Sequence, residues 1–288
     1  MDILPQLIAN SLIVGATYAL LAMSFSLIYS VSRFFNIAHG VTAAIGGYTV
    51  LYLAKLHGVP LAAAIPLGIA AAALVGWCLE FFIYRRLRAR GASSAVTLIA
   101  SLGAFTALQA MLALTFTSQF QTLSNLVTIR TFTIGGGIFT SVQLIIFASS
   151  VAVCLGLWLL LSYTKFGKAV RAVSDDAEVA KIVGINTNTI IGITVAIGSG
   201  IAGLAGILIG FDTGLQPTMG FILLLKGIIG TIAGGIGSIS GSFLGAYLLG
   251  FVENFGIWQI SGEWKDAIAF TLLIVFLLFR PQGIFGKK

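Results

Sequence analysis

The charged residues of this chain are concentrated in one short segment between two long apolar runs. Of the 16 basic and 9 acidic residues, seven lie within residues 165–181, which we call the charged island. They are Lys165, Lys168, Arg171, Asp175, Asp176, Glu178 and Lys181. In a chain that is 58% hydrophobic, such a segment is where the protein meets water. The residue types fit a docking surface for another protein and a solvated loop equally well.

Capping chemistry predicts a short helix inside the charged island. Asp175 precedes Glu178 at capping-box spacing, and Asp176 lies in the same first turn, where a carboxylate interacts favourably with the helix dipole. Lys181 lies near the far end of this helix. Gly184 is placed to be the glycine that ends it.

The predicted helix is about two turns long. It runs from Asp176 to Val183, with Ala177, Ala180 and Val183 along one face. A helix this short is marginal in isolation, so we expect it to dock against something. Its support is either the protein's own membrane helices or a second protein.

Two polar residues, Asn36 and His39, separate the first two apolar runs. Asn36 is placed to accept backbone N–H bonds at the start of a helix over 40–55, and this capping role explains it as well as a functional role does. A histidine near the membrane is costly unless it has a partner or water. We therefore favour a functional role for His39 on an internal polar path.

An ionisable residue, Lys226, interrupts the apolar run that contains Phe221. Inside a spanning helix such a residue is by default a functional candidate. The alternative is that Lys226, about two turns from the start of its run, extends its charge toward the membrane interface. Glu253 poses the same question near the end of its own helix.

Membrane helices must position these residues, because the composition does not suit a soluble domain. Only 9% of the residues are charged and the mean hydropathy is +1.05, whereas soluble domains are about one quarter charged. Apolar runs of about 20 residues recur, which is the length a helix needs to cross a bilayer. In lipid the backbone must satisfy its own hydrogen bonds, so these runs are helical. We predict an all-α polytopic integral membrane protein with a single transmembrane domain over residues 1–288.

Three other features fit this class. The first apolar run lacks a preceding basic region and is too long for a signal peptide, so we interpret it as the first membrane helix. Cys78 and Cys154 lie in apolar segments without the spacing of a disulfide or zinc site. The net charge of +7 gathers beside membrane helices, so it indicates topology and no nucleic-acid partner.

The number of crossings follows from nine apolar runs and three basic clusters. The runs are 5–31, 41–56, 60–84, 95–117, 139–163, 189–211, 219–236, 238–257 and 265–279. The clusters are Arg85, Arg86, Arg88 and Arg90; Lys165, Lys168, Arg171 and Lys181; and Arg280, Lys287 and Lys288. The positive-inside rule places all three clusters, and the C-terminus, on the cytoplasmic side. Nine crossings follow, or eight if the second run is re-entrant, and we favour nine.

Two segments interrupt the regular pattern of helices. Residues 118–138 form the longest piece on the outer side, and their alternation with three consecutive glycines predicts a short extracytoplasmic hairpin or cap. The run Gly234-Gly235-Ile236-Gly237-Ser238 predicts a broken helix. Broken helices occur at membrane depth where they are buried in protein or line a cavity. Elsewhere, glycines four residues apart favour tight helix packing.

Four segments carry a resemblance to a known family. They are Asn36-Ile37-Ala38-His39-Gly40; Phe166-Gly167-Lys168-Ala169-Val170-Arg171-Ala172-Val173, continuing to Asn186; Gly234-Gly235-Ile236-Gly237-Ser238 with Gly241; and Arg280-Pro281-Gln282-Gly283-Ile284-Phe285-Gly286. In this order, over nearly the whole chain, they resemble the branched-chain amino acid permeases, the LivH-type membrane subunits of ATP-binding cassette importers. Ile37, Lys168 and Ser240 stand where the family commonly has Phe, Arg and Pro, and these departures leave the assignment intact.

The resemblance implies roles for particular residues. It makes residues 164–189 a cytoplasmic coupling loop seated on an ATPase subunit. The candidate coupling residues are Gly167, Lys168, Arg171, Asp175, Asp176, Glu178, Lys181 and Gly184. The candidates for the translocation path or gate are Asn36, His39, Lys226, Gly234, Gly235 and Gly237.

The resemblance also implies partners. They are a homologous permease subunit in a heterodimer, two cytoplasmic ATPases and an extracytoplasmic binding protein, assembled in a bacterial-type inner or plasma membrane. The chain itself has no phosphate-binding loop, since Gly167-Lys168 lacks the upstream glycine and the following hydroxyl. We therefore expect no catalytic site, metal or cofactor in this chain, and ATP on the partner subunits.

The expected function is uptake of branched-chain or neutral aliphatic amino acids by alternating access. The same type of importer for urea, amides or small carboxylates is an alternative. So is an ion-coupled secondary transporter, although it would need carboxylates or a proton relay at mid-membrane, and such candidates are few. An intramembrane enzyme would need a nucleophile or metal cluster that the sequence does not show.

Overall fold

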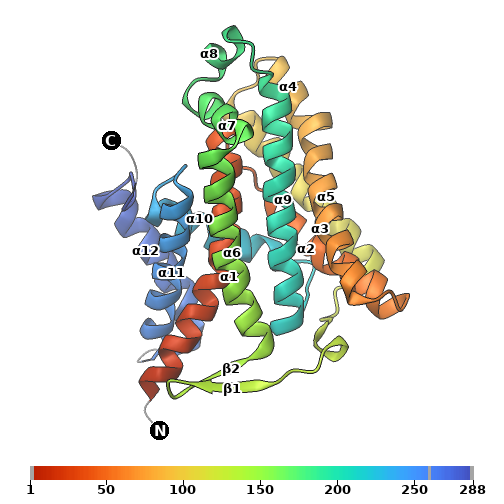
Figure 1. Cartoon of the computed structure of the whole chain (residues 1–288), viewed down its shortest axis with the longest axis vertical. Helices are drawn as coiled ribbons and strands as arrows, with labels where there is room; N and C mark the ends of the chain where they lie inside the picture. The colour runs from red at the N-terminus through yellow and green to blue at the C-terminus, as the bar shows by residue number, and fades with distance from the viewer. Residues whose placement is uncertain (1–2, 259–260, 286–288) are drawn as a thin grey trace.

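Helices make up most of the computed structural model, which describes residues 3–258 and 261–285 (Figure 1). The α-helices are α1 (Ile3–Ser32), α2 (His39–Val50), α3 (Leu61–Leu79), α4 (Arg85–Ala89), α5 (Ser94–Phe116), α6 (Ser141–Tyr163), α7 (Lys165–Asp175), α8 (Ala177–Ile182), α9 (Thr187–Asp212), α10 (Met219–Gly234), α11 (Ile239–Gly256) and α12 (Lys265–Phe279). The π-helical segments η1 (Leu51–Leu56) and η2 (Glu80–Tyr84) extend α2 and α3. The predicted all-α polytopic class is confirmed.

The two ends of the molecule carry different elements (Figure 1). The helices α4, α7 and α8 gather at one end, so the first basic cluster and the charged island lie together. Pro281, next to Arg280, lines the same pocket as Arg171 of α7. The described parts of all three basic clusters therefore share one end, as the parity argument predicts. Lys287 and Lys288 lie outside the described residues.

The opposite end carries the predicted hairpin, formed by β1 (Thr131–Ile134) and β2 (Gly137–Thr140). Its strands are antiparallel, with Ile134 opposite Gly137. The turn uses Gly135 and Gly136, which both have positive φ. Gln6 accepts a hydrogen bond from the Ile138 backbone N–H, so the hairpin lies against the start of α1. Short 3-10 turns, η3 (Ser124–Leu126) and η4 (Gly262–Trp264), complete the connections.

The predicted count of eight or nine crossings is not confirmed. Within the described ranges 3–258 and 261–285, five helices are long and apolar enough to span a membrane: α1, α3 with its extension to Ala89, α5, α6 and α9. A sixth span results if α10 and α11, which meet at 114°, count as one. All nine apolar runs are helical, but α2, α10, α11 and α12 do not pass alone. These four helices have 12, 16, 18 and 15 residues, fewer than the about 20 that a straight crossing needs.

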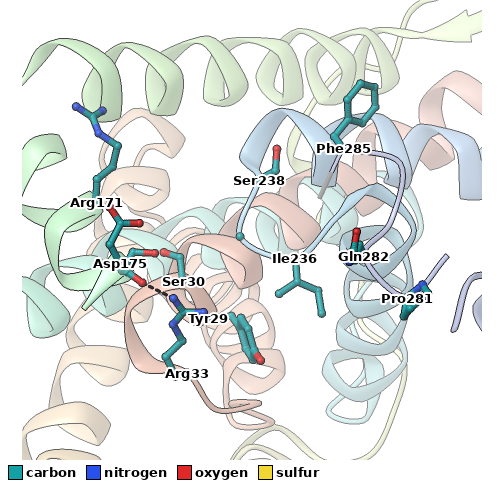
Figure 2. Close-up of a pocket in the computed structure, with 12 residues that line it drawn as sticks. Tyr29, Ser30, Arg33, Arg171, Asp175, Ile236, Ser238, Pro281, Gln282 and Phe285 are labelled. Carbon is teal, nitrogen blue, oxygen red and sulfur yellow. Dashed lines mark hydrogen bonds between the residues drawn. The ribbon is translucent and has the colours of Figure 1, made fainter. Parts of the chain in front are cut away.

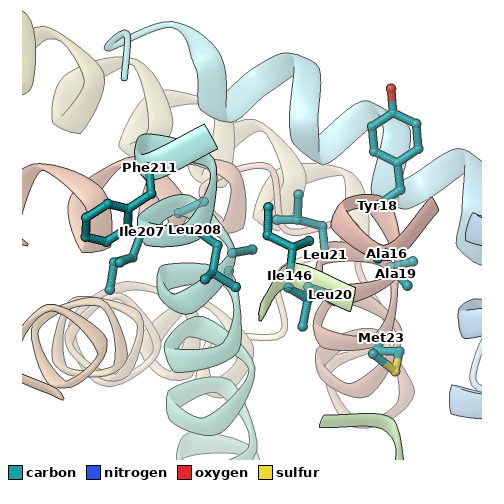
Figure 3. Packing of buried hydrophobic residues seen from close by; sticks show 14 of the residues in the cluster. Ala16, Tyr18, Ala19, Leu20, Leu21, Met23, Ile146, Ile207, Leu208 and Phe211 are labelled. Carbon is teal, nitrogen blue, oxygen red and sulfur yellow. The ribbon is translucent and has the colours of Figure 1, made fainter. Parts of the chain in front are cut away.

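The core lies between α1 and α9. The apolar window of α1 is 83% buried and that of α9 is 67% buried, whereas those of α5 and α6 are only 17% buried. Figure 3 shows Leu20 and Leu21 of α1 near Ile146 of α6 and Ile207 of α9. Two central helices are therefore wrapped by others whose outer faces are apolar, as expected of surfaces that meet lipid.

Glycines let the central helices approach one another closely. A Cβ at Gly206 would lie 1.8 Å from the carbonyl oxygen of Ala43 on α2, and one at Gly46 would lie 2.5 Å from that of Gly203 on α9. Similar limits hold where Gly234 meets Gly241 across the α10–α11 break. The predicted packing role of these glycines is confirmed. In lipid such close backbone packing is a main source of helix association.

We predict that Gly206→Ala weakens the folded bundle. The new methyl group would meet the Ala43 backbone, which cannot rotate away as a side chain can, and overpacking of this kind costs about 1–3 kcal/mol. The matched control is Gly103→Ala in α5, where a Cβ meets nothing within 4 Å. Thermal unfolding of the purified protein in detergent should show a lower midpoint for Gly206→Ala alone. Equal midpoints for both variants would contradict the packing account.

Candidate functional site

The charged island folds into two helices, α7 and α8, and not into a loop with one helix. Thr164 caps α7, because its Oγ1 accepts a hydrogen bond from the Gly167 N–H at 2.9 Å. Gly167, Val170 and Val173 form the buried face of α7. A Cβ at Gly167 would lie 2.3 Å from the Leu161 carbonyl oxygen, so glycine permits the tight turn from α6. Sequence reasoning missed α7, although Thr164 and the spacing of the two valines signal it.

The cap of α8 is Asp176, which corrects the prediction that Asp175 begins the capping box. Asp176 Oδ1 accepts hydrogen bonds from the N–H groups of Glu178 at 2.8 Å and Val179 at 3.0 Å. These bonds hold the pKa of the Asp176 carboxyl below its ordinary value. Asp175 is instead the last residue of α7. Gly184 follows α8 with φ +86°, as its predicted role in ending the helix requires.

The apolar face predicted for α8 is correct for two of its three residues. Ala180 is buried and Ala177 packs half-buried against the same cluster, whereas Val183 is exposed. The exposed apolar residues are Val183, Val179 and Ile182, whose exposed fraction is 83%. A short helix thus shows two apolar faces, one resting on its own protein and one facing outward. An outward apolar face beside charged residues is typical of a protein-binding surface.

The charged residues of the island differ in their surroundings. Lys168, Glu178 and Lys181 are exposed and make no hydrogen bond or ion pair through their side chains among the described residues. The Arg171 guanidinium donates to the Leu161 carbonyl, which joins α7 to the end of α6. In the same way Arg33, after α1, donates to the Ser174 carbonyl of α7. The arginines therefore hold the island in place, while the other three side chains are free to meet a partner.

A pocket of about 570 Å³ lies beside the island (Figure 2). Four segments line it: the end of α1, α7, the α10–α11 break and the chain after α12. The lining residues are Tyr29, Ser30, Arg33, Arg171, Ser174, Asp175, Ile236, Gly237, Ser238, Pro281, Gln282 and Phe285. Three sequence motifs that lie far apart in the chain therefore meet around one cavity.

The glycine run forms the predicted break between α10 and α11. Gly235 and Gly237 both have positive φ, at +114° and +87°, which suits glycine and few other residues. The carbonyl of Gly234 accepts a hydrogen bond from the Phe285 N–H at 2.9 Å. The Gly237 N–H donates to Ser26 Oγ of α1. These three glycines thus tie α1, the break and the C-terminal segment together at the island's end of the molecule.

Asn36 and His39 are buried inside the bundle. The Asn36 side chain does not cap α2, as the sequence had suggested, but accepts a hydrogen bond from the Tyr84 hydroxyl at 3.0 Å. His39 is 1% exposed, and its Nε2 lies 2.8 Å from Ser24 Oγ of α1. The histidine partner that the sequence required is therefore a serine fifteen positions earlier, on the preceding helix.

Lys226 is buried and pairs with acidic side chains of two other helices. It is 5% exposed, and its Nζ lies 2.5 Å from Glu253 Oε1 and 2.8 Å from Asp266 Oδ1. The Tyr18 hydroxyl donates to Glu253 Oε2 at 2.9 Å. Lys265 Nζ lies 3.7 Å from the same oxygen. This ionic cluster joins α1, α10, α11 and α12. The sequence identified Lys226 and Glu253 as candidates but did not predict that they contact each other.

A second buried pair was missed. Glu80, in η2, lies 2.5 Å from the Arg88 guanidinium. Arg88 also donates to Asn188 Oδ1, at the start of α9, at 3.4 Å. Glu80, Arg88 and Asn188 come from different segments of the chain, so their contacts are seen only in the folded structure. Among residues 3–258 and 261–285, no three His, Cys, Asp or Glu side chains gather as a metal site.

Comparison with known proteins places these features in one family. The model of a family described as the branched-chain amino acid transport system permease component matches residues 7–277. The chain is 36% identical over 296 residues to the high-affinity branched-chain amino acid transport system permease protein BraD of Pseudomonas aeruginosa. It is 31% identical over 296 residues to the corresponding protein LivH of Escherichia coli. Each match covers 98% of this chain and 95% of the relative.

A solved structure shares the fold. It is PsaBC from Streptococcus pneumoniae in complex with Fab, with a TM-score of 0.50 and 13% sequence identity. The likeness covers 96% of this chain and 92% of that one, and at this identity it supports the fold alone. The family model and the full-length relatives decide the assignment. The chain belongs to the family of permease components of branched-chain amino acid transport systems.

Proposed function

We propose that this chain is the membrane subunit of an ATP-binding cassette importer for branched-chain or other neutral aliphatic amino acids. The observation that carries the proposal is similarity over 98% of the chain to permeases named for high-affinity branched-chain amino acid transport. The charged island supports it, because an importer subunit without its own nucleotide site must contact an ATPase. The exposed apolar face of α8 provides a surface for that contact.

The island acts as the coupling element in this proposal, and its residues divide into two groups. Lys168, Glu178 and Lys181 contact the ATPase through their exposed side chains, together with Asp175 at the mouth of the pocket. The others shape the element. Gly167 permits the α6–α7 turn, Arg171 holds α7 to α6, Asp176 caps α8 and Gly184 ends it. A rigid element of this kind transmits movement of the ATPase to α6 and α9.

The island, the first basic cluster and the C-terminus face the cytoplasm in this proposal. The support is the positive-inside rule combined with the gathering of the basic clusters at one end of the bundle. The hairpin of β1 and β2 then lies outside, in the segment 118–138 and just beyond it. That placement gives an extracytoplasmic binding protein a surface to dock on and leaves the ATPase surface at the other end.

The working assembly contains a homologous permease subunit, two ATPases and a binding protein in a bacterial-type inner membrane. ATP hydrolysis takes place on the ATPases. The cargo is a branched-chain amino acid, as the names of the relatives suggest, and urea, amides and small carboxylates are the alternatives. The buried interior around α1 and α9 is mostly apolar, which suits a cargo with an aliphatic side chain.

Reconstitution tests this function directly. The complete assembly in liposomes should accumulate labelled leucine only when ATP and the binding protein are both present. Omission of the ATPases should abolish uptake, because this chain lacks a phosphate-binding loop. Accumulation of leucine by this chain alone, driven by an ion gradient, would contradict the importer proposal and support a secondary transporter.

We predict that Ile182→Glu prevents binding of the ATPase. A carboxylate on the exposed apolar face of α8 would be desolvated on docking, and an unpaired buried charge costs several kcal/mol. The matched control is Ile134→Glu, an exposed residue of the hairpin at the opposite end. Co-purification with the ATPase should fall at least about 10-fold for Ile182→Glu only, since 1.4 kcal/mol is tenfold in affinity. Equal loss in both variants would contradict docking at α8.

We also predict that Glu178→Lys uncouples hydrolysis from uptake. Glu178 is exposed and only its backbone N–H is used by the Asp176 cap, so the variant keeps α8 but reverses a charge on the docking face. ATP turnover should persist in liposomes while leucine transported per ATP falls. The matched control is Glu263→Lys, the same charge reversal at an exposed residue of η4, outside the charged island. If Glu178→Lys transports as much leucine per ATP as the wild type, the prediction that Glu178 contacts the ATPase is wrong.

The Lys226–Glu253 pair is the strongest gate candidate of the buried charges, and it predicts a contrast between variants. Lys226→Met leaves Glu253 buried without its main partner, and breaking such a pair costs about 3–5 kcal/mol. The double variant Lys226→Met/Glu253→Gln removes both charges and should restore thermal stability. If the pair serves the path, the double variant still transports poorly. Normal uptake by a stable double variant would leave the pair a structural role only.

A further inference from the structure

Two helices of the bundle begin in the same way. Residues 36–40 follow the long helix α1 and lead into α2, and residues 216–220 follow the long helix α9 and lead into α10. Both segments close with a turn, in which the His39 N–H bonds the Asn36 carbonyl and the Met219 N–H bonds the Gln216 carbonyl. Each new helix has glycine as its second residue. The chain thus repeats a unit of long helix, turn and second helix.

The two units are inverted relative to each other. The helix α1 begins at the hairpin end of the molecule, whereas α9 follows α8 and so begins at the island end (Figure 1). Units related in this way form the inverted repeats from which many transporters are built, with binding sites at the repeat interface.

The helices of the two units meet at their N-termini. A Cβ at Gly40 would lie 2.4 Å from the Gly220 carbonyl oxygen, and a Cβ at Gly220 would lie 2.4 Å from the Gly40 carbonyl oxygen. This contact is reciprocal, as expected where a pseudo-twofold axis passes between two equivalent helices. The backbones touch, so this conformation is closed at that point.

His39, the first residue of α2, supplies an unused polar atom at this junction. Its Nδ1 is buried and has no hydrogen-bond partner among the described residues. Its Nε2 lies 2.8 Å from Ser24 Oγ, and Ser24 donates its only hydroxyl proton to the Leu21 carbonyl at 3.0 Å. The His39 tautomer consistent with that bond donates its Nε2 proton to Ser24 Oγ and leaves Nδ1 as a bare acceptor. A buried acceptor without a protein partner accepts its hydrogen bond from a buried water or from a bound ligand.

We propose that this junction binds the zwitterionic head group of the transported α-amino acid, an inference that rests on the function proposed above. The cargo's ammonium group donates to His39 Nδ1. Its carboxylate faces the N-terminal turns of α2 and α10, where helix dipoles favour negative charge. Leu224, next to Gly40, and Phe25, next to His39, give the aliphatic side chain apolar neighbours. The head group enters when α2 and α10 separate at Gly40 and Gly220.

The chain offers a direct spectroscopic test, because it contains only two histidines. The other, His57, is exposed, so His57→Gln leaves His39 as the single histidine. This subunit is labelled with 15N-histidine, purified without a histidine tag, and assembled with unlabelled partners in lipid. Solid-state NMR then measures the Nδ1 shift and its dipolar coupling to 13C-labelled leucine, in nucleotide-free and vanadate-trapped assemblies. We expect a shift of Nδ1 and a measurable coupling in at least one of these states.

Three results would overturn the proposal. One is an Nδ1 signal that cargo leaves unchanged in both states, which indicates a buried water only. Another is the same Nδ1 shift with 4-methylpentanoate, which has no ammonium group. The third is absence of coupling to leucine while the assembly still transports it. Leucine uptake by the His57→Gln assembly is measured in the same preparation, so failure of this site is distinguished from failure of the importer function.

Transport by two His39 variants adds a second readout. His39→Phe keeps a ring but no acceptor, and His39→Asn keeps an acceptor near the position of Nδ1. Loss of a hydrogen bond to a charged group predicts a leucine uptake roughly 10- to 100-fold lower for His39→Phe, with partial recovery in His39→Asn. Equal uptake by both variants, at wild-type thermal stability, would contradict the assignment of Nδ1 as a cargo contact.

Discussion

Close contact between glycine-bearing backbones is the constraint on which the rest of this structure depends. It brings α2 against α9 at Gly206 and α2 against α10 at Gly40 and Gly220. Lipid gives no hydrophobic driving force for helices to associate, so the bundle relies on packing of this kind and on a few polar bonds. Two helices that touch through their backbones also have two distinct arrangements, one with the backbones in contact and one with the helices separated. A transporter needs that property.

The buried charged and polar groups connect the helices that the glycines bring together. Lys226 and Glu253 join four helices, and Glu80 and Arg88 join the end of α3 to the start of α9 through Asn188. Removing the two charges of each pair from water costs free energy, so the pairs add little to stability. We infer that they determine which helices move together. The bonds of Arg33 and Arg171 to the island extend the same connection outward, from the helix junctions to the surface where an ATPase would bind.

How far the sequence predicts this structure follows from the range of each interaction. Local signals worked: every apolar run is helical, Gly184 ends α8, and the glycine run breaks the helix after α10. The capping of α8 was misplaced by one residue because Asp175 and Asp176 offer the same chemistry, and the backbone after α7 decides between them. The count of eight or nine spans is not confirmed, since the length of an apolar run does not show how long its helix is inside the bundle.

The candidate site was predictable in its residues but not in its geometry. A histidine or a lysine in an apolar run is recognised from the sequence as a candidate. Ser24, Tyr18 and Asp266 have no such signal, and only the fold shows that they contact His39, Glu253 and Lys226. Asn36 illustrates the limit. It has the type and position of a helix cap, yet the Tyr84 hydroxyl from a distant segment takes its side-chain oxygen. Long-range pairing overrides a local preference worth only about 1 kcal/mol.

The central claim is that α2 and α10 part at their N-termini during transport, and cross-linking between positions 38 and 218 tests it most directly. Cys78 and Cys154, the only cysteines, are replaced by alanine, and Ala38→Cys and Thr218→Cys are introduced two residues before the Gly40–Gly220 contact. The full assembly is treated with a short bifunctional maleimide without nucleotide and after vanadate trapping. The account predicts efficient cross-linking in one state and a clear loss in the other. Equal cross-linking in both states, in an assembly that transports leucine, would contradict it.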